Sequence, residues 1–173
     1  MSQKKNKGTK GKAFEKAFQN SCKRQGIKCQ RLRDNQLSYT SSEKTYKQPY
    51  DFETYLYPNL LCLELKATNL SSVTFEREDE ENSKMLHQHQ IKGLENASQY
   101  HGVFAGILID FLTSGTTYYL PIQEFLKFYN DNDKKSIAEK DIKSLKSIIV
   151  DKKLLRTTYE YNINKLFMDI TNQ

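Results

Sequence analysis

The residues of this sequence best suited to chemistry are two carboxylates and a lysine in neighbouring runs. In the run 61–66, leucines alternate with other residues, which predicts a strand with one buried face and with Glu64 and Lys66 on the opposite face. Asp51 begins a second strand-like run, and residues 57–59 between the two runs are a turn signal. If the runs pair as a hairpin about this turn, Asp51 lies opposite Glu64.

Such a cluster has a defined chemical use. Two carboxylates a few ångströms apart make a hard oxygen site for Mg²⁺ or Mn²⁺. A metal held there polarises a phosphodiester, while a neighbouring lysine orients or deprotonates the attacking water or stabilises charge on the phosphate. The arrangement predicts phosphodiester hydrolysis. The spacing alone is equally compatible with a solvated strand face on which Asp51, Glu64 and Lys66 form a cross-strand ion pair.

Composition limits the class of protein. The chain has 173 residues, which favours one domain with its own core. Its net charge of +6 indicates a polyanionic partner. No window predicts a membrane span or a signal peptide, so we expect a cytoplasmic protein without a membrane partner. The cysteines Cys22, Cys29 and Cys62 lack metal-ligand spacing and are interpreted as reduced, structural thiols rather than a zinc site.

The N-terminal part of the chain carries most of the basic residues that we expect to contact DNA. Residues 1–10 are expected to form a flexible basic arm, followed by a helix over 11–25 with Glu15 just beside its apolar stripe and Gly26 as its stop. A strand over 27–32 and a polar loop over 33–48 complete this region. The basic residues expected to meet DNA phosphates are Lys10, Lys12, Arg31, Arg33, Lys44 and Lys47.

The region after the hairpin contains an acidic run and a helix. The run 76–81 would repel DNA, so we expect it either to face away from the DNA or to remain mobile, and a role in shielding the site electrostatically stays open. A helix over 84–101 places His89 and Gln90 near its apolar stripe, where each by default satisfies a backbone carbonyl or another side chain. His87 and His89 are two apart, so on a helix they do not share a face, which argues against a metal pair.

The remaining segments predict an α/β domain. Residues 103–111 form a strand buried on both faces, residues 117–121 its partner, and residues 121–129 a short helix. A lysine-rich helical stretch about Ile142, Leu145 and Ile149 follows. We therefore expect a nuclease domain over 11–173, built as a sheet flanked by helices without regular parallel crossover units.

With these residues placed, the chain resembles the PD-(D/E)xK nuclease superfamily. More narrowly, it resembles the RecU-type Holliday junction resolvases of low-GC Gram-positive bacteria and their phages. The resemblance spans 11–121 and depends on the order and spacing of several motifs together. These are Gly11-Lys12-Ala13-Phe14-Glu15, Gln48-Pro49-Tyr50-Asp51, Glu64-Leu65-Lys66, His87-Gln88-His89-Gln90 and the apolar strand before Tyr118-Tyr119-Leu120.

The resemblance implies a restriction-endonuclease-like mixed sheet and a metal-dependent homodimer that nicks a four-way DNA junction symmetrically. Asp51 and Glu64 would bind Mg²⁺, for which Mn²⁺ may substitute, with Glu15 as a further acidic ligand or a water-mediated partner. Lys66 would act on the attacking water or the phosphate. Gln90 would line the site beside His89, a supporting group that contacts DNA.

Two features depart from the family pattern. Family members usually carry a hydroxyl residue close before the aspartate, where this chain has Pro49-Tyr50, and no catalytic role is assigned there. They also carry a basic stalk that enters the junction, for which the segment 33–48 is short.

Two further hypotheses stay open. The chain could be a restriction-type or repair nuclease that acts on ordinary duplex DNA. It could also be a basic DNA-binding protein without metal or catalysis, which predicts salt-sensitive binding and no cleavage in Mg²⁺.

Overall fold

The computed structural model describes residues 7–32, 47–77 and 84–172. Arg33, Lys44 and most of the acidic run lie outside these residues, as does the arm up to residue 6. No helix in the described ranges is long and apolar enough to cross a membrane.

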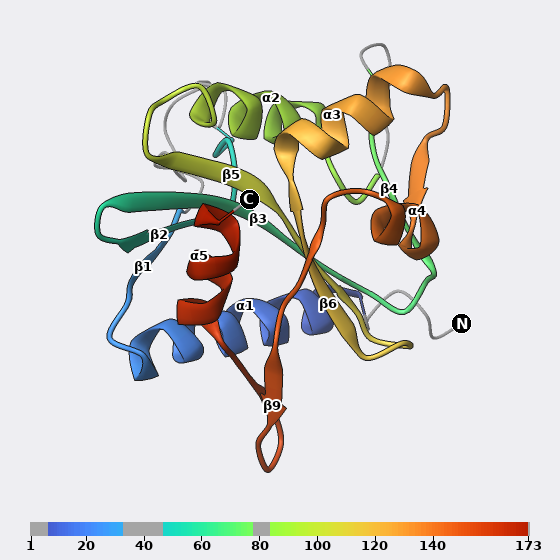
Figure 1. Ribbon diagram of the computed structural model, residues 1–173. Coiled ribbons are helices and arrows are strands. Elements are labelled where there is room, and N and C mark those ends of the chain that lie inside the picture. Colours follow the sequence, from blue (N-terminus) through green and yellow to red (C-terminus); the bar gives the residue numbers. More distant parts are fainter. Residues whose placement is uncertain (1–6, 33–46, 78–83, 173) are drawn as a thin grey trace, which may run out of the picture.

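A mixed sheet forms the centre of the molecule (Figure 1). In its described part the strand order is β1-β2-β3-β5-β6-β8, in which β3 and β5 run parallel and the other neighbours antiparallel. The parallel pair is joined by a crossover that contains helix α2 (Gln88–Ala97). The strands are β1 (Lys28–Arg31), β2 (Phe52–Leu56), β3 (Asn59–Thr68), β5 (Val103–Phe111), β6 (Thr116–Pro121) and β8 (Ile148–Ile149).

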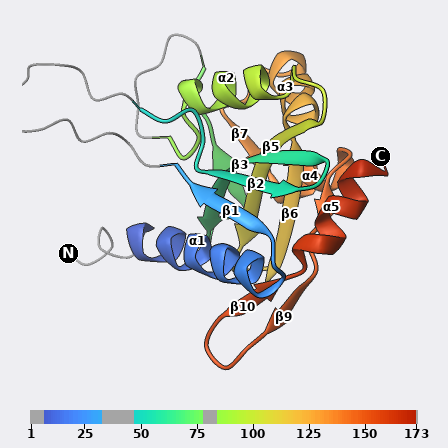
Figure 2. The same ribbon diagram turned by 90° about the vertical axis from the view of Figure 1, so that its left-hand side faces the viewer.

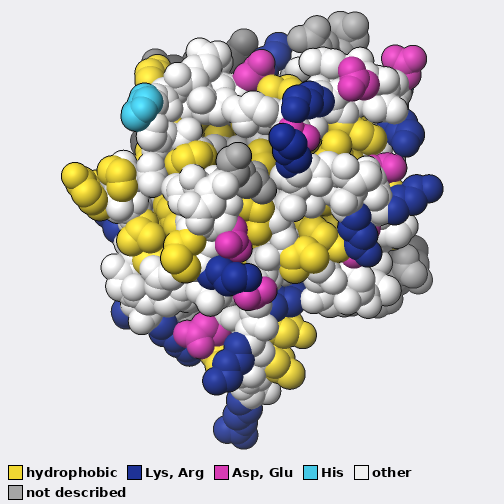
Figure 3. All heavy atoms as spheres, in the orientation of Figure 1, with side chains coloured by type: hydrophobic (Ala, Val, Ile, Leu, Met, Phe, Trp, Pro, Cys, Tyr) yellow, Lys and Arg dark blue, Asp and Glu magenta, His cyan; other side chains and the backbone are white. Residues whose placement is uncertain are grey.

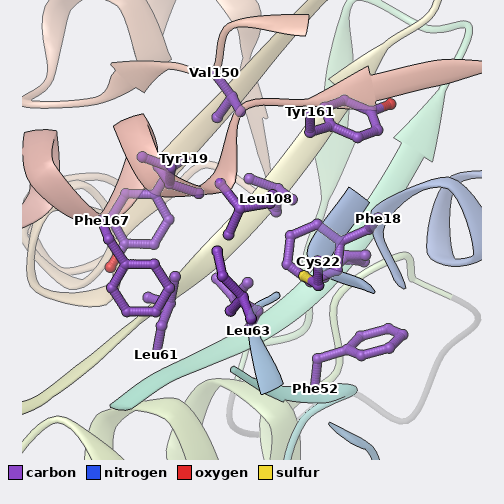
Figure 4. Close-up of a cluster of buried hydrophobic side chains, with 14 of the residues drawn as sticks. Phe18, Cys22, Phe52, Leu61, Leu63, Leu108, Tyr119, Val150, Tyr161 and Phe167 are labelled. Carbon is purple, nitrogen blue, oxygen red and sulfur yellow. The ribbon is translucent and has the colours of Figure 1, made fainter. Parts of the chain in front are cut away.

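Helices cover both faces of this sheet (Figures 1 and 2). α1 (Lys7–Arg24) and α5 (Ile163–Thr171) pack on one face, around a core that includes Phe18, Leu63 and Phe167 (Figure 4). α2 and α3 (Ile122–Asp131) pack on the other face, around a second core. The expected single α/β domain with a mixed sheet flanked by helices is confirmed.

The hairpin of β2 and β3 has the expected register. Phe52 pairs with Leu63 and Leu56 with Asn59, so Asp51 comes opposite Glu64. One expectation about β3 is wrong, because both of its faces are buried. Leu61, Leu63 and Leu65 enter the first core, whereas Cys62 enters the second core beneath α2. The alternation within β3 could not predict that α2, which follows later in the chain, covers its second face.

The first helix begins earlier than expected. α1 starts at Lys7, so residues 7–10 are helical rather than part of an arm. Its apolar stripe is buried as expected, with Phe14, Ala17, Phe18 and Cys22 all in the first core. The helix ends before Gly26, whose φ of 68° lies in the left-handed region that favours glycine.

The C-terminal third differs most from expectation. Residues 142 to 149 do not form one helix, because α4 ends at Ser144 and Ile149 belongs to β8, the edge strand. The hairpin of β9 (Lys152–Leu154) and β10 (Tyr159–Tyr161) then projects from the body, with dark-blue basic side chains at its tip (Figures 1 and 3). The remaining elements are α4 (Glu139–Ser144) and the paired short strands β4 (Ser72–Thr74) and β7 (Ser136–Ala138).

A buried polar cluster ties this hairpin to the sheet. Lys152 Nζ donates to Asp110 Oδ1 at 2.7 Å and to Thr117 Oγ1 at 2.9 Å, and Thr117 donates to the same carboxylate at 2.6 Å. The Lys152 ammonium also lies over the ring of Tyr159, 4.5 Å from its centroid. A buried charge pair needs such partners, because an uncompensated ion in the interior is costly.

Candidate active site

Glu64 lies at the centre of a buried polar cluster on β3. Its residue exposure is 1%. Its Oε1 accepts from Lys66 Nζ at 2.5 Å and from Gln90 Nε2 at 2.6 Å. Oε2 is also buried and has no hydrogen-bond partner among the described residues. An unpartnered buried oxygen of this kind costs about 1–3 kcal/mol, so the site has unused capacity for a proton or a cation.

This burial removes the alternative of a solvated strand face. The Lys66 side chain is only 15% exposed. A solvated pair would leave both side chains in water and both carboxylate oxygens hydrated. Here α2 covers the face instead, and Gln90 reaches down from it to Glu64.

Asp51 is held opposite Glu64 by both neighbouring strands. Its backbone N–H donates to Leu63 O at 3.1 Å, and its backbone O accepts from Leu32 N at 2.8 Å. Its side chain Oδ2 accepts from the Leu65 N–H at 3.0 Å. A main-chain N–H therefore holds the carboxylate in this position.

The surroundings change the acidity of Glu64. Burial raises the pKa of Glu64 to about 8, the Lys66 ammonium opposes this, and the nearby Asp51 carboxylate adds to it. The burial effect is the largest of these. Burial therefore favours the protonated form of Glu64 when no cation is bound.

Gln90 has two roles at the start of α2. Its Oε1 accepts from the His87 backbone N–H at 2.9 Å, which forms a capping box with His87 as the N-cap. Its Nε2 is thereby turned toward Glu64. The helix begins at Gln88 and ends at Ala97, so it is shorter than the expected 84–101.

Gly93 brings α2 close to the segment that leads to Asp51. A Cβ at Gly93 would lie 2.5 Å from Pro49 Cβ and 2.6 Å from Pro49 O. Only glycine therefore permits this contact, which sets the distance between the helix that carries Gln90 and the strand that follows Asp51.

The residue before Asp51 is engaged in a local hydrogen-bond network. The Tyr50 hydroxyl donates to Glu53 Oε1 at 3.0 Å and accepts from Cys62 Sγ at 3.4 Å. Cys62 is a free thiol, as are Cys22 and Cys29.

A carboxylate–imidazole contact lies at the N-cap of α2. His87 Nδ1 is 2.7 Å from Glu76 Oε1, and the His87 ring stacks on His89 with centroids 5.6 Å apart. Two sequence expectations are corrected here. Glu76, the first residue of the acidic run, does not face away from the site. The two histidines do share a face, because His87 is the cap and not a helical residue.

Asp51, His87, His89 and Gln90 line one open cavity of about 260 Å³, whereas Glu64 and Lys66 are not among its lining residues. The rest of the lining is Arg31, Leu32, Lys47, Gln48 and Tyr50. The structure thus brings together Asp51, Glu64, Lys66 and Gln90 and puts Arg31, Lys47 and His89 beside them. Lys10 and Lys12 lie on α1 and are not among the lining residues.

Glu15 has a different environment from the other two carboxylates. Its Oε2 accepts from Arg31 Nε at 2.7 Å. In the described ranges no three carboxylate, histidine or cysteine side chains are grouped so that they could hold a metal together. The predicted trio of Glu15, Asp51 and Glu64 is therefore not assembled, although the pair of Asp51 and Glu64 is.

The donor set of that pair fits a hard cation. Two carboxylates face each other across the hairpin, and one buried oxygen of Glu64 has no partner among the described residues. Oxygen ligands of this type suit Mg²⁺ or Mn²⁺, which complete their coordination with water and substrate oxygens.

Sequence reasoning did not assign Gly93, Glu76 or His87 to this site. Gly93 gave a signal as a glycine within a helical pattern, which often marks close packing. The pairing of Glu76 with His87 gave none, because it depends on how β4 meets the start of α2.

The fold class is also that of known proteins. The solved structure of Archaeoglobus fulgidus Hjc, described as a Holliday junction resolvase from an archaeal hyperthermophile, matches with a TM-score of 0.52 and 15% identity. The match covers 78% of this chain and 93% of that one. The fold is therefore the mixed α/β fold of that resolvase.

The family is shown by sequence. The family model "RecU: Recombination protein U" matches residues 23–165, and the chain belongs to this family. A prophage-derived uncharacterized protein of Bacillus subtilis strain 168, YotM, is 29% identical over 166 residues, which cover 92% of this chain and 70% of YotM.

Proposed function

We propose that this protein is a structure-selective endodeoxyribonuclease that resolves four-way DNA junctions with Mg²⁺, for which Mn²⁺ can substitute. The observation that carries the proposal is the buried Oε2 of Glu64, which has no hydrogen-bond partner within residues 7–32, 47–77 and 84–172 and lies beside Asp51 and Lys66. Membership of the RecU family and the likeness to the fold of Hjc support the choice of branched DNA as substrate.

Asp51 and Glu64 would hold the cation. When bound, it supplies Lewis-acid polarisation of the scissile phosphate and a more acidic water. Lys66 Nζ, held by Glu64 Oε1, orients the attacking water and stabilises charge on the phosphate. Gln90 fixes the orientation of the Glu64 carboxylate through its 2.6 Å hydrogen bond.

Basic groups around the cavity would hold the DNA backbone. Arg31 and Lys47 line the cavity, with His89 beside them. Glu15 is neutralised by Arg31, so its proposed role is to fix that guanidinium at the cavity rather than to bind the cation directly. Arg33, Lys44, Lys10 and Lys12 would extend the contact to neighbouring phosphates.

A resolvase must cut two strands related by symmetry. One chain offers one set of Asp51, Glu64 and Lys66, so we propose a homodimer in which each protomer makes one of two paired nicks.

The test uses a synthetic four-way junction and a linear duplex of the same sequence, each with and without Mg²⁺. Glu64→Ala is compared with the wild type. Glu95→Ala is the matched control, because Glu95 is an exposed glutamate on α2. We expect paired, metal-dependent nicks in the junction by the wild type and the control, and a loss of at least about 10²-fold in Glu64→Ala.

Other outcomes would select another function. Equal cutting of the duplex would indicate a general nuclease of the same superfamily. Tight, salt-sensitive binding without cleavage in Mg²⁺ or Mn²⁺ would indicate a DNA-binding protein.

A further inference from the structure

Glu76 and His87 form an oriented carboxylate–imidazole pair at the cavity. Glu76 Oε1 is 2.7 Å from His87 Nδ1, and Glu76 Oε2 accepts from the Gln88 backbone N–H at 3.0 Å. Although burial acts to raise it, the pKa of Glu76 is lowered by the Gln88 N–H and by His87. Glu76 is therefore an ionised carboxylate with both oxygens engaged.

This pair fixes the imidazole in one orientation. Because Nδ1 faces Glu76, Nε2 lies on the opposite side of the ring. The ring is clamped further by His89, which stacks on it at an interplanar angle of 16°. A carboxylate that holds Nδ1 also complements the positive charge of an imidazolium. The side chain remains 38% exposed, so Nε2 can meet a substrate.

The pair is coupled to the proposed reaction centre by short contacts. The His87 backbone N–H donates to Gln90 Oε1 at 2.9 Å, and Gln90 Nε2 donates to Glu64 Oε1 at 2.6 Å. His87 lines the same cavity as Asp51 and Gln90. The other charged groups around that cavity are Arg31 and Lys47, which suit a phosphate backbone.

We propose that His87, oriented by Glu76, is the general acid that protonates the leaving O3′ of the cut strand. The oxygen of water forms a bond to phosphorus, the P–O3′ bond breaks, and its electron pair goes to O3′. O3′ takes the proton from His87 Nε2, while the attacking water releases its proton to solvent. Neutral His87 is then reprotonated from solvent. His87 is thus a catalytic residue and Glu76 a positioning residue.

Lys66 is poorly placed for this role. Its ammonium is held by Glu64 Oε1 at 2.5 Å and by Gln90 Oε1 at 3.5 Å, and the proposed function already assigns it to the attacking water. In-line displacement needs the acid on the opposite side of phosphorus from the nucleophile. A second, separately held donor such as His87 meets that need.

The inference depends on the proposed nuclease function, and the experiment separates the two. After mapping the cut with wild-type protein, two junctions are compared, one with the normal P–O3′ linkage and one with sulfur in place of O3′. Sulfur leaves without a proton, so it does not need a general acid. The variants are His87→Asn and, as the matched control, His101→Asn, which changes an exposed histidine after α2. Asparagine is a favourable N-cap and should keep α2 intact.

On the normal linkage, His87→Asn should lower the single-turnover rate by about 10²- to 10⁴-fold. On the sulfur linkage its rate should come within a few-fold of the wild type. His101→Asn should match the wild type on both. If His87→Asn does not fold, as judged by its thermal melt, Glu76→Gln should show the same rescue with a smaller initial loss.

An equal loss on both linkages, or no loss, would overturn the role of His87 and leave the nuclease function standing. If the wild type cuts neither linkage in Mg²⁺ or Mn²⁺, the proposed function fails and this inference fails with it.

Discussion

At the scale of single residues, Glu64 links the site to the stability of the protein. Burial raises the pKa of Glu64 from 4.5 to about 8, so the folded protein holds this proton more tightly than the unfolded chain does. The resulting contribution to stability is fully present below about pH 4.5 and is lost as the pH rises through about 8. A bound cation would take the place of the proton and reverse that loss.

We expect the metal-free wild type to lose a few kcal/mol of unfolding free energy over this pH range relative to Glu64→Gln, since one pKa unit corresponds to about 1.4 kcal/mol. The glutamine is neutral at every pH and should flatten the dependence. Denaturant unfolding at several pH values measures the difference, and adding Mg²⁺ should restore the wild type at the alkaline end. Parallel curves for the two proteins would contradict this.

Site residues that lie close together in the sequence could be predicted from it, whereas those brought together by tertiary packing could not. Asp51, Glu64 and Lys66 lie on one hairpin, whose turn and alternation determine which side chains face each other. Gln90 was recovered by the resemblance, but its role as both cap and ligand to Glu64 was not. Glu76 and His87 meet through tertiary packing between β4 and α2, for which no sequence period exists.

At the scale of elements, Gly93 controls how closely α2 approaches the segment before β2. Ala at this position would place a Cβ 2.5 Å from Pro49 Cβ, so the helix or the segment must move. We expect Gly93→Ala to lower the unfolding free energy by about 1–3 kcal/mol and to reduce cleavage, because Gln90 and Asp51 would separate.

Gly11→Ala is the matched control for that change. Gly11 is also helical, and a Cβ there would meet nothing within 4 Å. Its helix propensity alone should raise stability by about 0.5–1 kcal/mol without changing cleavage. Denaturant unfolding and junction cleavage are measured for both variants and compared with the wild type. A Gly93→Ala protein as stable and active as Gly11→Ala would show that the close contact has no consequence.

The elements that sequence reasoning missed are short and depend on distant partners. β4 and β7 have three residues each and form a separate two-stranded sheet. Ile142 and Ile149 have a spacing compatible with a helix, yet Ile149 pairs with Tyr118 at the edge of the sheet. Long elements such as β5 were predicted correctly because their apolar runs are continuous.

At the scale of the whole molecule, the net charge of +6 would attract a DNA backbone beyond the cavity. Lys4 and Lys5 belong to the expected basic arm of residues 1–10, and we propose that this arm contacts phosphates. If both make contacts, replacing them with serine should weaken junction binding and reduce the slope of log K against log salt by about 0.9 per contact. Lys4→Arg with Lys5→Arg keeps the charge and should keep the slope. An unchanged slope in the serine variant would show that the arm does not contact the DNA phosphates.

The capping box of α2 has a consequence for motion. Gln90 secures the first turn of the helix with one end of its amide and Glu64 with the other. Helix ends are where proteins most readily open by local unfolding. Each such fraying event would therefore release the Glu64 carboxylate and disassemble the catalytic centre. Conversely, a junction and cation bound at Glu64 should slow amide hydrogen exchange in that turn, far more than in the C-terminal turn of the same helix.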